Sequence, residues 1–212
     1  MAVFRNGSSG GFSGRNGNVI TYMLNGQWVS RIIGLRTDKP TKPVLAVWQV
    51  TKLAADFLKP VKDFIRTGFE LETKGTFLNY HNVAAEYNRL NAITGEYPDQ
   101  RIDFTKVLFS KGKMPATPGI SVKAIKKGLT FSWDSSFSAI GIKANDEVML
   151  LAYEPDTKDA TFSLYAGKRA GGEASLSIRK RKDPLVLETY ISFISQNRKI
   201  ISDSIYAGQI IW

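Results

Sequence analysis

Few residues of this 212-residue chain could carry out nucleophilic or acid–base chemistry. The chain contains no cysteine and one histidine, His81. Without cysteine, a thiolate nucleophile, a disulfide and a Cys-ligated zinc or iron–sulfur site are all excluded. A Ser-His-Asp triad or a His-bridged metal would depend on His81 alone. Since no carboxylate is spaced to orient His81 on the helix that it precedes, we interpret it as a surface or capping residue.

Two further motifs were considered for ligand binding. The acidic residues Glu154, Asp156 and Asp159 could bind calcium, but no bidentate Glu follows at the required loop position, so we expect a solvated hairpin turn. The glycine-rich residues 11–17 precede a predicted strand. They match neither of the phosphate-binding patterns G-x-x-x-x-G-K-[ST] and G-x-G-x-x-G. We therefore predict no catalytic residue, no metal, no cofactor and a protein that is not an enzyme.

The charge is more informative than these motifs. The formal net charge is +10, and residues 1–66 hold ten Lys and Arg against three acids, which is +7 of that total. A second basic cluster, Arg179, Lys180, Arg181 and Lys182, is expected at a strand end beside Lys168 and Arg169. Such polycations bind nucleic acid by releasing counterions. No sequence-specific DNA- or RNA-binding motif is present, so we expect non-specific contact with an anionic partner.

The N-terminal elements would position the first basic region. Residues 1–18 form an arm rich in Gly, Ser and Asn, and residues 19–24 and 27–33 are predicted to be strands joined by an Asn25-Gly26 type I′ turn. We expect the edges of this hairpin to be unpaired, and therefore open to strand addition. Aromatic and arginine residues alternate along this stretch, which makes it a candidate for subunit contacts or an anionic partner; the candidates are Phe12, Arg15, Tyr22, Trp28 and Arg31.

Helices follow the hairpin. An apolar stripe predicts a helix over residues 47–58 that ends at Pro60, and a shorter one over 61–65 that stops at Gly68. A third helix is expected over residues 82–93 and a strand over 103–109. The proline- and glycine-rich residues 114–119 are typical of a linker, so we predict two domains, residues 1–114 and 115–212.

The second half has no helical period. It contains short alternating runs separated by turn residues, and these predict seven strands over residues 120–125, 129–133, 147–153, 161–166, 173–178, 185–194 and 199–206. Seven strands in about 95 residues indicate a β-sandwich. The predicted class is therefore α+β, with an N-terminal arm, β-hairpin and helices followed by an all-β sandwich.

This second half resembles the fibronectin type III or immunoglobulin-like sandwich. Residues 129–134 resemble the second strand of that family with its core tryptophan, Trp133, and residues 190–193 resemble the penultimate strand, beginning at Tyr190. The lack of cysteine excludes a disulfide-bonded antibody-type domain. We expect Trp133 and Tyr190 to be core residues, because both alternate with polar neighbours.

The whole chain also resembles an uncharacterised family of about 200 residues from Bacteroidota bacteria and their phages. Four motifs in order carry the resemblance: Gly11–Arg15 with Gly17–Val19, Phe57–Lys62, Asn91–Gly95 and Val107–Gly112. The resemblance supports the architecture, and it implies no activity.

These features together favour a non-enzymatic structural subunit that assembles with copies of itself or with neighbouring virion proteins. The most specific form of this hypothesis is a phage virion protein (capsid, tail or decoration) or a self-assembling shell or filament protein. The alternative is an accessory protein that binds nucleic acid non-specifically through the basic N-terminal region, and a third hypothesis is a surface carbohydrate-binding module. Residues 1–18 have no apolar run typical of a secretory signal, and no apolar run approaches the length of a membrane span. We expect synthesis in the cytoplasm, and location in the virion if a phage encodes the protein.

Overall fold

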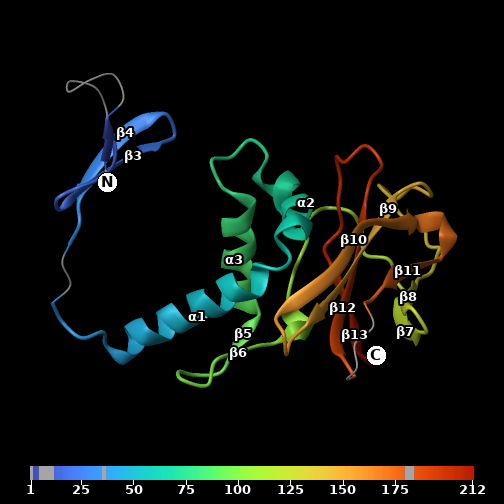
Figure 1. Ribbon diagram of the computed structural model, residues 1–212. Coiled ribbons are helices and arrows are strands. Elements are labelled where there is room, and N and C mark those ends of the chain that lie inside the picture. The colour runs from blue at the N-terminus through green and yellow to red at the C-terminus, as the bar shows by residue number, and fades with distance from the viewer. Residues whose placement is uncertain (1, 5–11, 35–36, 180–183) are drawn as a thin grey trace. The chain divides into compact units, whose positions relative to one another are not determined.

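The computed structural model describes residues 2–4, 12–34, 37–179 and 184–212 (Figure 1). The contacts divide the chain into two compact units, Met1–Thr41 and Lys42–Trp212. Strands dominate the C-terminal half and helices precede them, which confirms the predicted α+β class.

The N-terminal unit is a four-stranded antiparallel sheet in the order β1-β2-β3-β4. Its strands are β1 (Ala2–Phe4), β2 (Phe12–Asn16), β3 (Val19–Leu24) and β4 (Gln27–Ile32). Positive φ angles of 49° at Asn25 and 80° at Gly26 confirm the turn expected between β3 and β4. The expectation that both hairpin edges are unpaired was wrong, because part of the glycine-rich arm forms β2 and pairs with β3.

Three helices open the second unit: α1 (Lys42–Leu58), α2 (Lys62–Thr73) and α3 (Tyr80–Asn91). Gly68 does not stop α2, as had been expected. It lies within the helix, where a Cβ atom would collide with the backbone carbonyl of Phe109, so glycine lets α2 pack closely against residues 109–110. The strand expected over 103–109 is also absent from the described chain. The short strands β5 (Ile93–Thr94) and β6 (Arg101–Ile102) pair instead, and the 3₁₀ helix η1 (Phe104–Lys106) follows.

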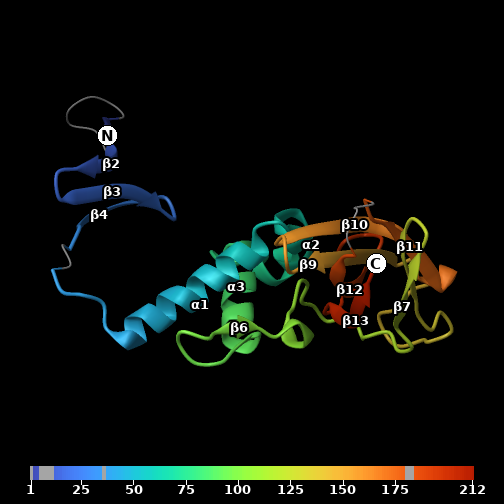
Figure 2. The same cartoon turned by 60° about the horizontal axis from the view of Figure 1, so that its bottom comes forward.

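Two sheets form the β-sandwich-like part of this unit (Figure 2). The strands are β7 (Ser121–Ile125), β8 (Gly128–Ser132), β9 (Glu147–Glu154), β10 (Asp159–Lys168), β11 (Glu173–Ser177), β12 (Val186–Ile194) and β13 (Ile205–Ile211). The 3₁₀ helix η2 (Arg169–Gly171) lies between β10 and β11. One sheet has the order β11-β8-β7 and the other β10-β9-β12-β13. This arrangement keeps the first, second and fifth strands together and the third, sixth and seventh together, as in immunoglobulin-like sandwiches. Only the last strand lies clearly later than predicted.

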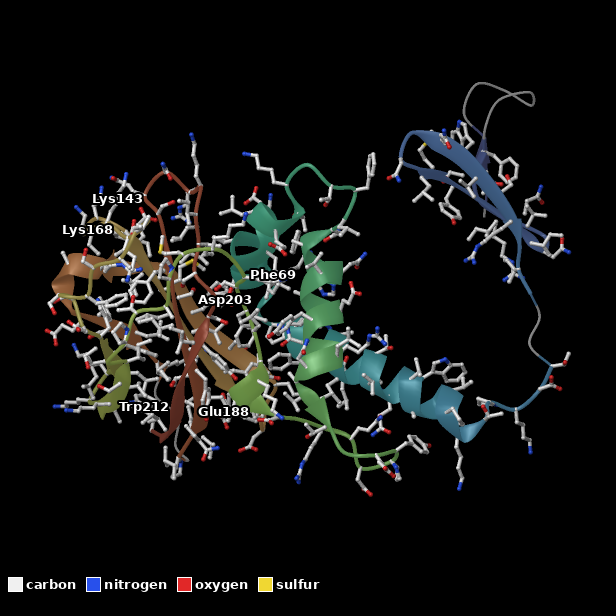
Figure 3. The ribbon with its side chains drawn as sticks, turned by 180° about the vertical axis from the view of Figure 1, so that it is seen from behind. Phe69, Lys143, Lys168, Glu188, Asp203 and Trp212 are labelled. Atoms are coloured by element: carbon white, nitrogen blue, oxygen red, sulfur yellow. The ribbon has the colours of Figure 1, made fainter. Side chains whose placement is uncertain are left out.

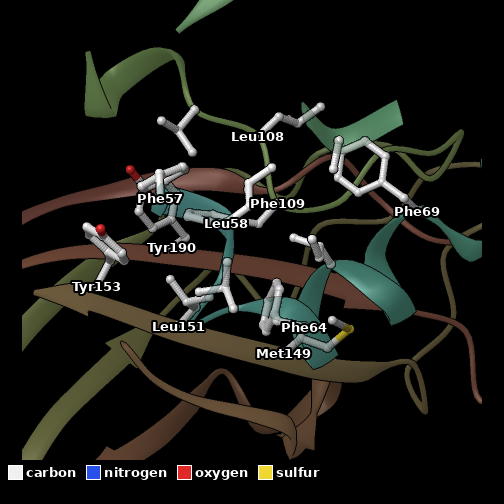
Figure 4. Close-up of a cluster of buried hydrophobic side chains, with 14 of the residues drawn as sticks. Phe57, Leu58, Phe64, Phe69, Leu108, Phe109, Met149, Leu151, Tyr153 and Tyr190 are labelled. Carbon is white, nitrogen blue, oxygen red and sulfur yellow. The ribbon is translucent and has the colours of Figure 1, made fainter. Parts of the chain in front are cut away.

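The four-stranded sheet is covered on both faces. Along β9, Val148, Leu150 and Ala152 face the three-stranded sheet, whereas Met149, Leu151 and Tyr153 face the helices. Figure 4 shows the second of these clusters, in which Phe57, Phe64 and Phe109 lie against Met149, Leu151 and Tyr190. The helices therefore form a third layer over the sandwich.

Trp133 and Tyr190 are both buried, as expected, but they belong to different cores. Trp133 packs between the two sheets with its ring centroid 5.6 Å from that of Phe193. Tyr190 points to the opposite face and packs edge-on against Phe109, with 4.6 Å between centroids. Its hydroxyl donates a hydrogen bond of 2.7 Å to the backbone carbonyl of Phe104, which ties η1 to the sheet.

A buried carboxylate lies on the same face of β12. Glu188 accepts hydrogen bonds from the Tyr206 hydroxyl, at 2.6 Å, and from Gln209 Nε2, at 2.7 Å. Both carboxylate oxygens thus have donors, as a buried charge requires. Burial and the Glu188 hydrogen bond raise the pKa of Tyr206, burial raises that of Tyr190, and burial raises the pKa of Tyr153 to about 12.

These tyrosines make the fold sensitive to alkali. A tyrosine whose folded pKa lies above its unfolded value of about 10 stabilises the fold fully below pH 10, and this contribution is lost as the pH rises toward 12. At pH 11, we expect less tyrosinate absorbance at 295 nm from the folded chain than from the chain in denaturant. Tyr153→Phe should reduce this difference, with the exposed Tyr165→Phe as control. Equal absorbance from folded and denatured protein would contradict the prediction.

The boundary expected between residues 114 and 115 falls inside the second unit. The core that holds Phe57, Phe64 and Phe109 also holds residues of β9 and β12. A chain of residues 115–212 would expose that face of the four-stranded sheet to water. We expect it to be aggregated or to lack dispersed amide signals in NMR spectra, whereas residues 42–212 should unfold in urea as one cooperative transition. A cooperatively folded, monomeric 115–212 fragment would refute this and support the sequence-based boundary.

Candidate functional site

The register of the N-terminal sheet sorts the candidate residues onto two faces, because directly paired residues of neighbouring strands point the same way. Arg15 pairs with Ile20, and Ile20 pairs with Arg31. Trp28 pairs with Met23 on the opposite face. The five candidate residues therefore divide between two faces: Arg15, Tyr22 and Arg31 lie on one, and Phe12 and Trp28 on the other.

We call the first of these the basic face. Its residues include Arg15, Ile20, Tyr22, Leu24, Gln27, Val29 and Arg31. The two arginines flank Ile20 in a row across three strands. Arg15 is held by a 2.8 Å hydrogen bond from its Nε to the carbonyl of Gly17. No acidic residue occurs in β2, β3 or β4, so this face offers only positive charge to a ligand.

The opposite side is the apolar face, formed by Phe12, Val19, Met23, Trp28 and Ile32. Ile32 is 71% exposed, Met23 50% and Trp28 43%. Two polar residues, Thr21 and Ser30, share this face and satisfy each other through a 2.7 Å hydrogen bond. An exposed apolar surface on a sheet is typical of a site that another protein surface covers.

The described part of the N-terminal unit buries no apolar side chain, and Thr21 is its one buried residue. A sheet with one apolar face gains stability by packing that face against a second layer. Among its described residues, the unit supplies no such layer from within. The described residues therefore leave Met23, Trp28 and Ile32 of the apolar face exposed.

A second exposed apolar surface occurs on the first half of α1. The segment Pro43–Val50 is almost wholly apolar, and Val47 and Trp48 are 54% and 53% exposed. The buried residues of α1 lie toward its other end, at Ala54, Phe57 and Leu58. The helix thus presents apolar side chains beyond the core that it helps to form.

The structure describes only part of the second basic cluster. Lys180, Arg181 and Lys182 lie outside the described residues. Arg179 lines a hollow of about 180 Å³ that Glu154 and Asp159 also line, so this site mixes both charges. Lys168 and Arg169 lie before β11 and Arg179 lies after it, so these residues are at opposite ends of that strand.

Arg169 is not a surface residue, as its place in a basic cluster had suggested, but a core residue that is 2% exposed. Its guanidinium lies 4.0 Å from the ring centroid of Phe193 and 3.6 Å from the Asp146 carboxylate, and it donates hydrogen bonds to Thr117 Oγ1 and Met114 Sδ. Burial lowers its pKa, and Asp146 opposes this effect. Arg169 therefore anchors the linker to the sandwich.

His81 lies at the start of α3 beside an open hollow of about 520 Å³. Asn79, rather than His81, caps the helix, by accepting a 2.9 Å hydrogen bond from the His81 backbone N–H. The hollow is lined by one carboxylate, Asp56, together with Lys59 and Lys62. Convergent acids, which an acid–base site at His81 would need, are not found among these lining residues.

The acidic residues of the β9–β10 hairpin do form a turn, as predicted. Glu154 pairs with Asp159 across it, but Glu154 is buried rather than solvated. Within the described ranges, no group of three or more His, Asp and Glu side chains is placed to hold a metal ion. None of the described helices has both the length and the apolar character to cross a membrane.

The sequence reasoning missed one surface. A hollow of about 600 Å³ lies between the end of α2, residues 111–113 and the loop that joins β12 to β13. Four lysines line it: Lys74, Lys111, Lys113 and Lys199. They lie in three distant parts of the sequence, so no local motif could predict that they come together.

Comparison with known proteins adds a family and no activity. Neither the curated proteins nor the solved structures include a match to this chain. One family model matches residues 11–208, which is nearly the whole chain, and it is described as a family of unknown function. The four sequence motifs and both compact units described above fall largely within this match. The chain belongs to this family, DUF6266.

Proposed function

We propose that the protein is a non-enzymatic structural subunit that assembles with copies of itself through the apolar face of its N-terminal sheet. The observation that carries this proposal is that Met23, Trp28 and Ile32 are exposed on one side of a sheet whose described residues bury no apolar side chain. A second copy offers the same surface, and a two-fold contact between identical faces would supply the missing layer.

The size of the surface suggests a repeated contact rather than one tight dimer. Four strands about 4.8 Å apart and six residues of about 3.4 Å each give a face of roughly 400 Å². Two such faces bury on the order of 800 Å², below the roughly 1,200 Å² of a stable interface. Additional contacts are then needed, and the exposed first half of α1 provides a second apolar surface. In its sharper form, the proposal is a virion component, shell or filament protein encoded by a Bacteroidota bacterium or its phage.

Assembly can be tested by changing the apolar face alone. Truncating a buried interface tryptophan costs about 2 kcal/mol, or roughly 30-fold in affinity. We therefore expect Trp28→Thr with Ile32→Thr to raise the dissociation constant for self-association of the full chain by at least this factor. Sedimentation experiments would then show a shift from oligomer toward monomer. Phe77→Thr with Ile140→Thr, which removes two side chains that are 89% and 99% exposed in the other unit, is the matched control.

Negative-stain micrographs of the same samples would show whether the assemblies are closed shells, rods or small oligomers. A wild-type chain that stays monomeric at high concentration, with amide signals of residues 12–32 dispersed as in a folded sheet, would sink the proposal. Equal loss of assembly in the control pair would refute the role of the apolar face.

The basic face favours a second candidate, an accessory protein that contacts nucleic acid non-specifically. Two arginines beside Tyr22, with no acid in the three strands, match the pairing of positive charge and stacking surface used by single-strand binders. The third hypothesis, carbohydrate binding, has less support, because Tyr165 is the one aromatic side chain that is strongly exposed in the described part of residues 115–212.

Salt dependence tests the second candidate. Each phosphate contact on a single strand contributes about 0.7 to the slope of log affinity against log salt. Arg15→Gln with Arg31→Gln should therefore lower that slope by about 1.4 in anisotropy titrations with a fluorescent oligonucleotide. Lys39→Gln with Lys42→Gln removes the same charge near the start of α1 and should change the slope less. No binding by the wild type at low salt would eliminate this candidate.

A further inference from the structure

The basic hollow at the end of α2 lies within the unit Lys42–Trp212 and has no part in the assembly surface. Its lining includes Leu71 near the end of α2, Lys111 and Lys113 from the segment just before the linker, and Lys199 and Ile200 from the β12–β13 loop. Figure 3 labels Phe69, two residues before Leu71 in α2, and Asp203, two residues after Ile201; the hollow lies near these labels.

The walls of the hollow are held in place by hydrogen bonds. Residues 110–114 run between α2 and residues 201–204. The Lys111 N–H donates to the Gly68 carbonyl at 3.1 Å, and the Met114 N–H donates to the Ile201 carbonyl at 2.9 Å. Gly112 donates to Asp203 Oδ1 at 2.9 Å, and a Cβ atom there would collide with the Ile201 carbonyl. A ligand would therefore meet a preformed site, which reduces the entropic cost of binding.

The charge of the lining is strongly positive. Four lysines and one glutamate give it a formal charge of +3. Glu72 is engaged by Lys111, with 2.9 Å between Oε1 and Nζ, and this hydrogen bond raises the pKa of Lys111. Across the described ranges, the ammonium groups of Lys74, Lys113 and Lys199 form no ion pair. Three cations are thus available at one rim.

The floor of the hollow is apolar. Leu71 is half-buried, Ile201 is buried, and Ile200 is 39% exposed. The methylene stems of the lysines add further apolar surface beneath their charged ends. The volume of about 600 Å³ lies within the range of small-ligand sites, which combine apolar walls with a few polar groups.

We propose that this hollow binds a small organic anion with an apolar body. The apolar part would lie on Leu71 and Ile200, and a carboxylate, phosphate or sulfonate group would meet the ammonium groups of the rim. The adjoining hollow on the other side of Lys74 is a poorer site for an anion, because its other cation, Arg198, is already paired with Glu147. The hollow beside His81 is also less positive, because two lysines line it together with the carboxylate of Asp56.

Naphthalene-1-sulfonate is a suitable probe, followed by amide NMR on the full chain. We expect saturable shifts centred on Lys74, Gly112 and Ile200. The triple variant Lys74→Gln, Lys113→Gln, Lys199→Gln should raise the dissociation constant of the sulfonate at least tenfold. Lys52→Gln, Lys123→Gln and Lys126→Gln, which remove three exposed lysines elsewhere, should change it less than twofold.

Two further arms separate charge from apolar contact. Naphthalene-1-methanol, which lacks the charge, and inorganic sulfate, which lacks the apolar body, should each bind at least tenfold more weakly than the sulfonate. Ile200→Ser should weaken sulfonate binding several-fold, whereas Ile140→Ser should not. Equal binding of the neutral analogue, shifts confined to residues 12–32, or equal weakening by the control lysine variants would each overturn the proposal.

Discussion

The unit Lys42–Trp212 depends on covering β9 and β12 on both faces. Successive residues of β9 enter opposite cores, so neither the three-stranded sheet nor the helices alone can remove the strand from water. The Tyr190 hydroxyl and the Glu188 carboxylate add polar links on the helical side. For this reason the helices and the sandwich form one packed unit, in which Gly68 and Gly112 permit close approach of neighbouring backbone segments.

The described residues of the N-terminal sheet do not meet the same requirement. Its apolar face has no second layer among the unit's described residues, and its other face carries Arg15 and Arg31. Because strand residues alternate, the two arginines lie on one face, and Met23, Trp28 and Ile32 lie on the other. The sheet thus has one face whose charges are all positive and another on which large apolar side chains are exposed.

Local features of the sequence predicted much of the fold. Asn25-Gly26 specified its turn, because few residues adopt two successive positive φ angles without strain. Alternation and turn residues located most strands of the sandwich. The apolar run Val148–Tyr153 indicates a strand that is buried on both faces, because it contains no alternating polar residues. The strand pattern was interpreted only as part of a two-sheet sandwich, so the layer of helices over the second face was not predicted.

The sequence by itself determined the α+β fold class, most strands of the sandwich, the Asn25-Gly26 turn, the positive charge of the first third of the chain and the scarcity of catalytic residue types. These properties depend on residues close together in the chain. Only the tertiary structure decided which side of a strand faces a core, as for Tyr190, and whether a charge is exposed or buried, as for Arg169. It also gathered Lys74, Lys113 and Lys199 around one hollow, because packing brings together segments that no local pattern relates.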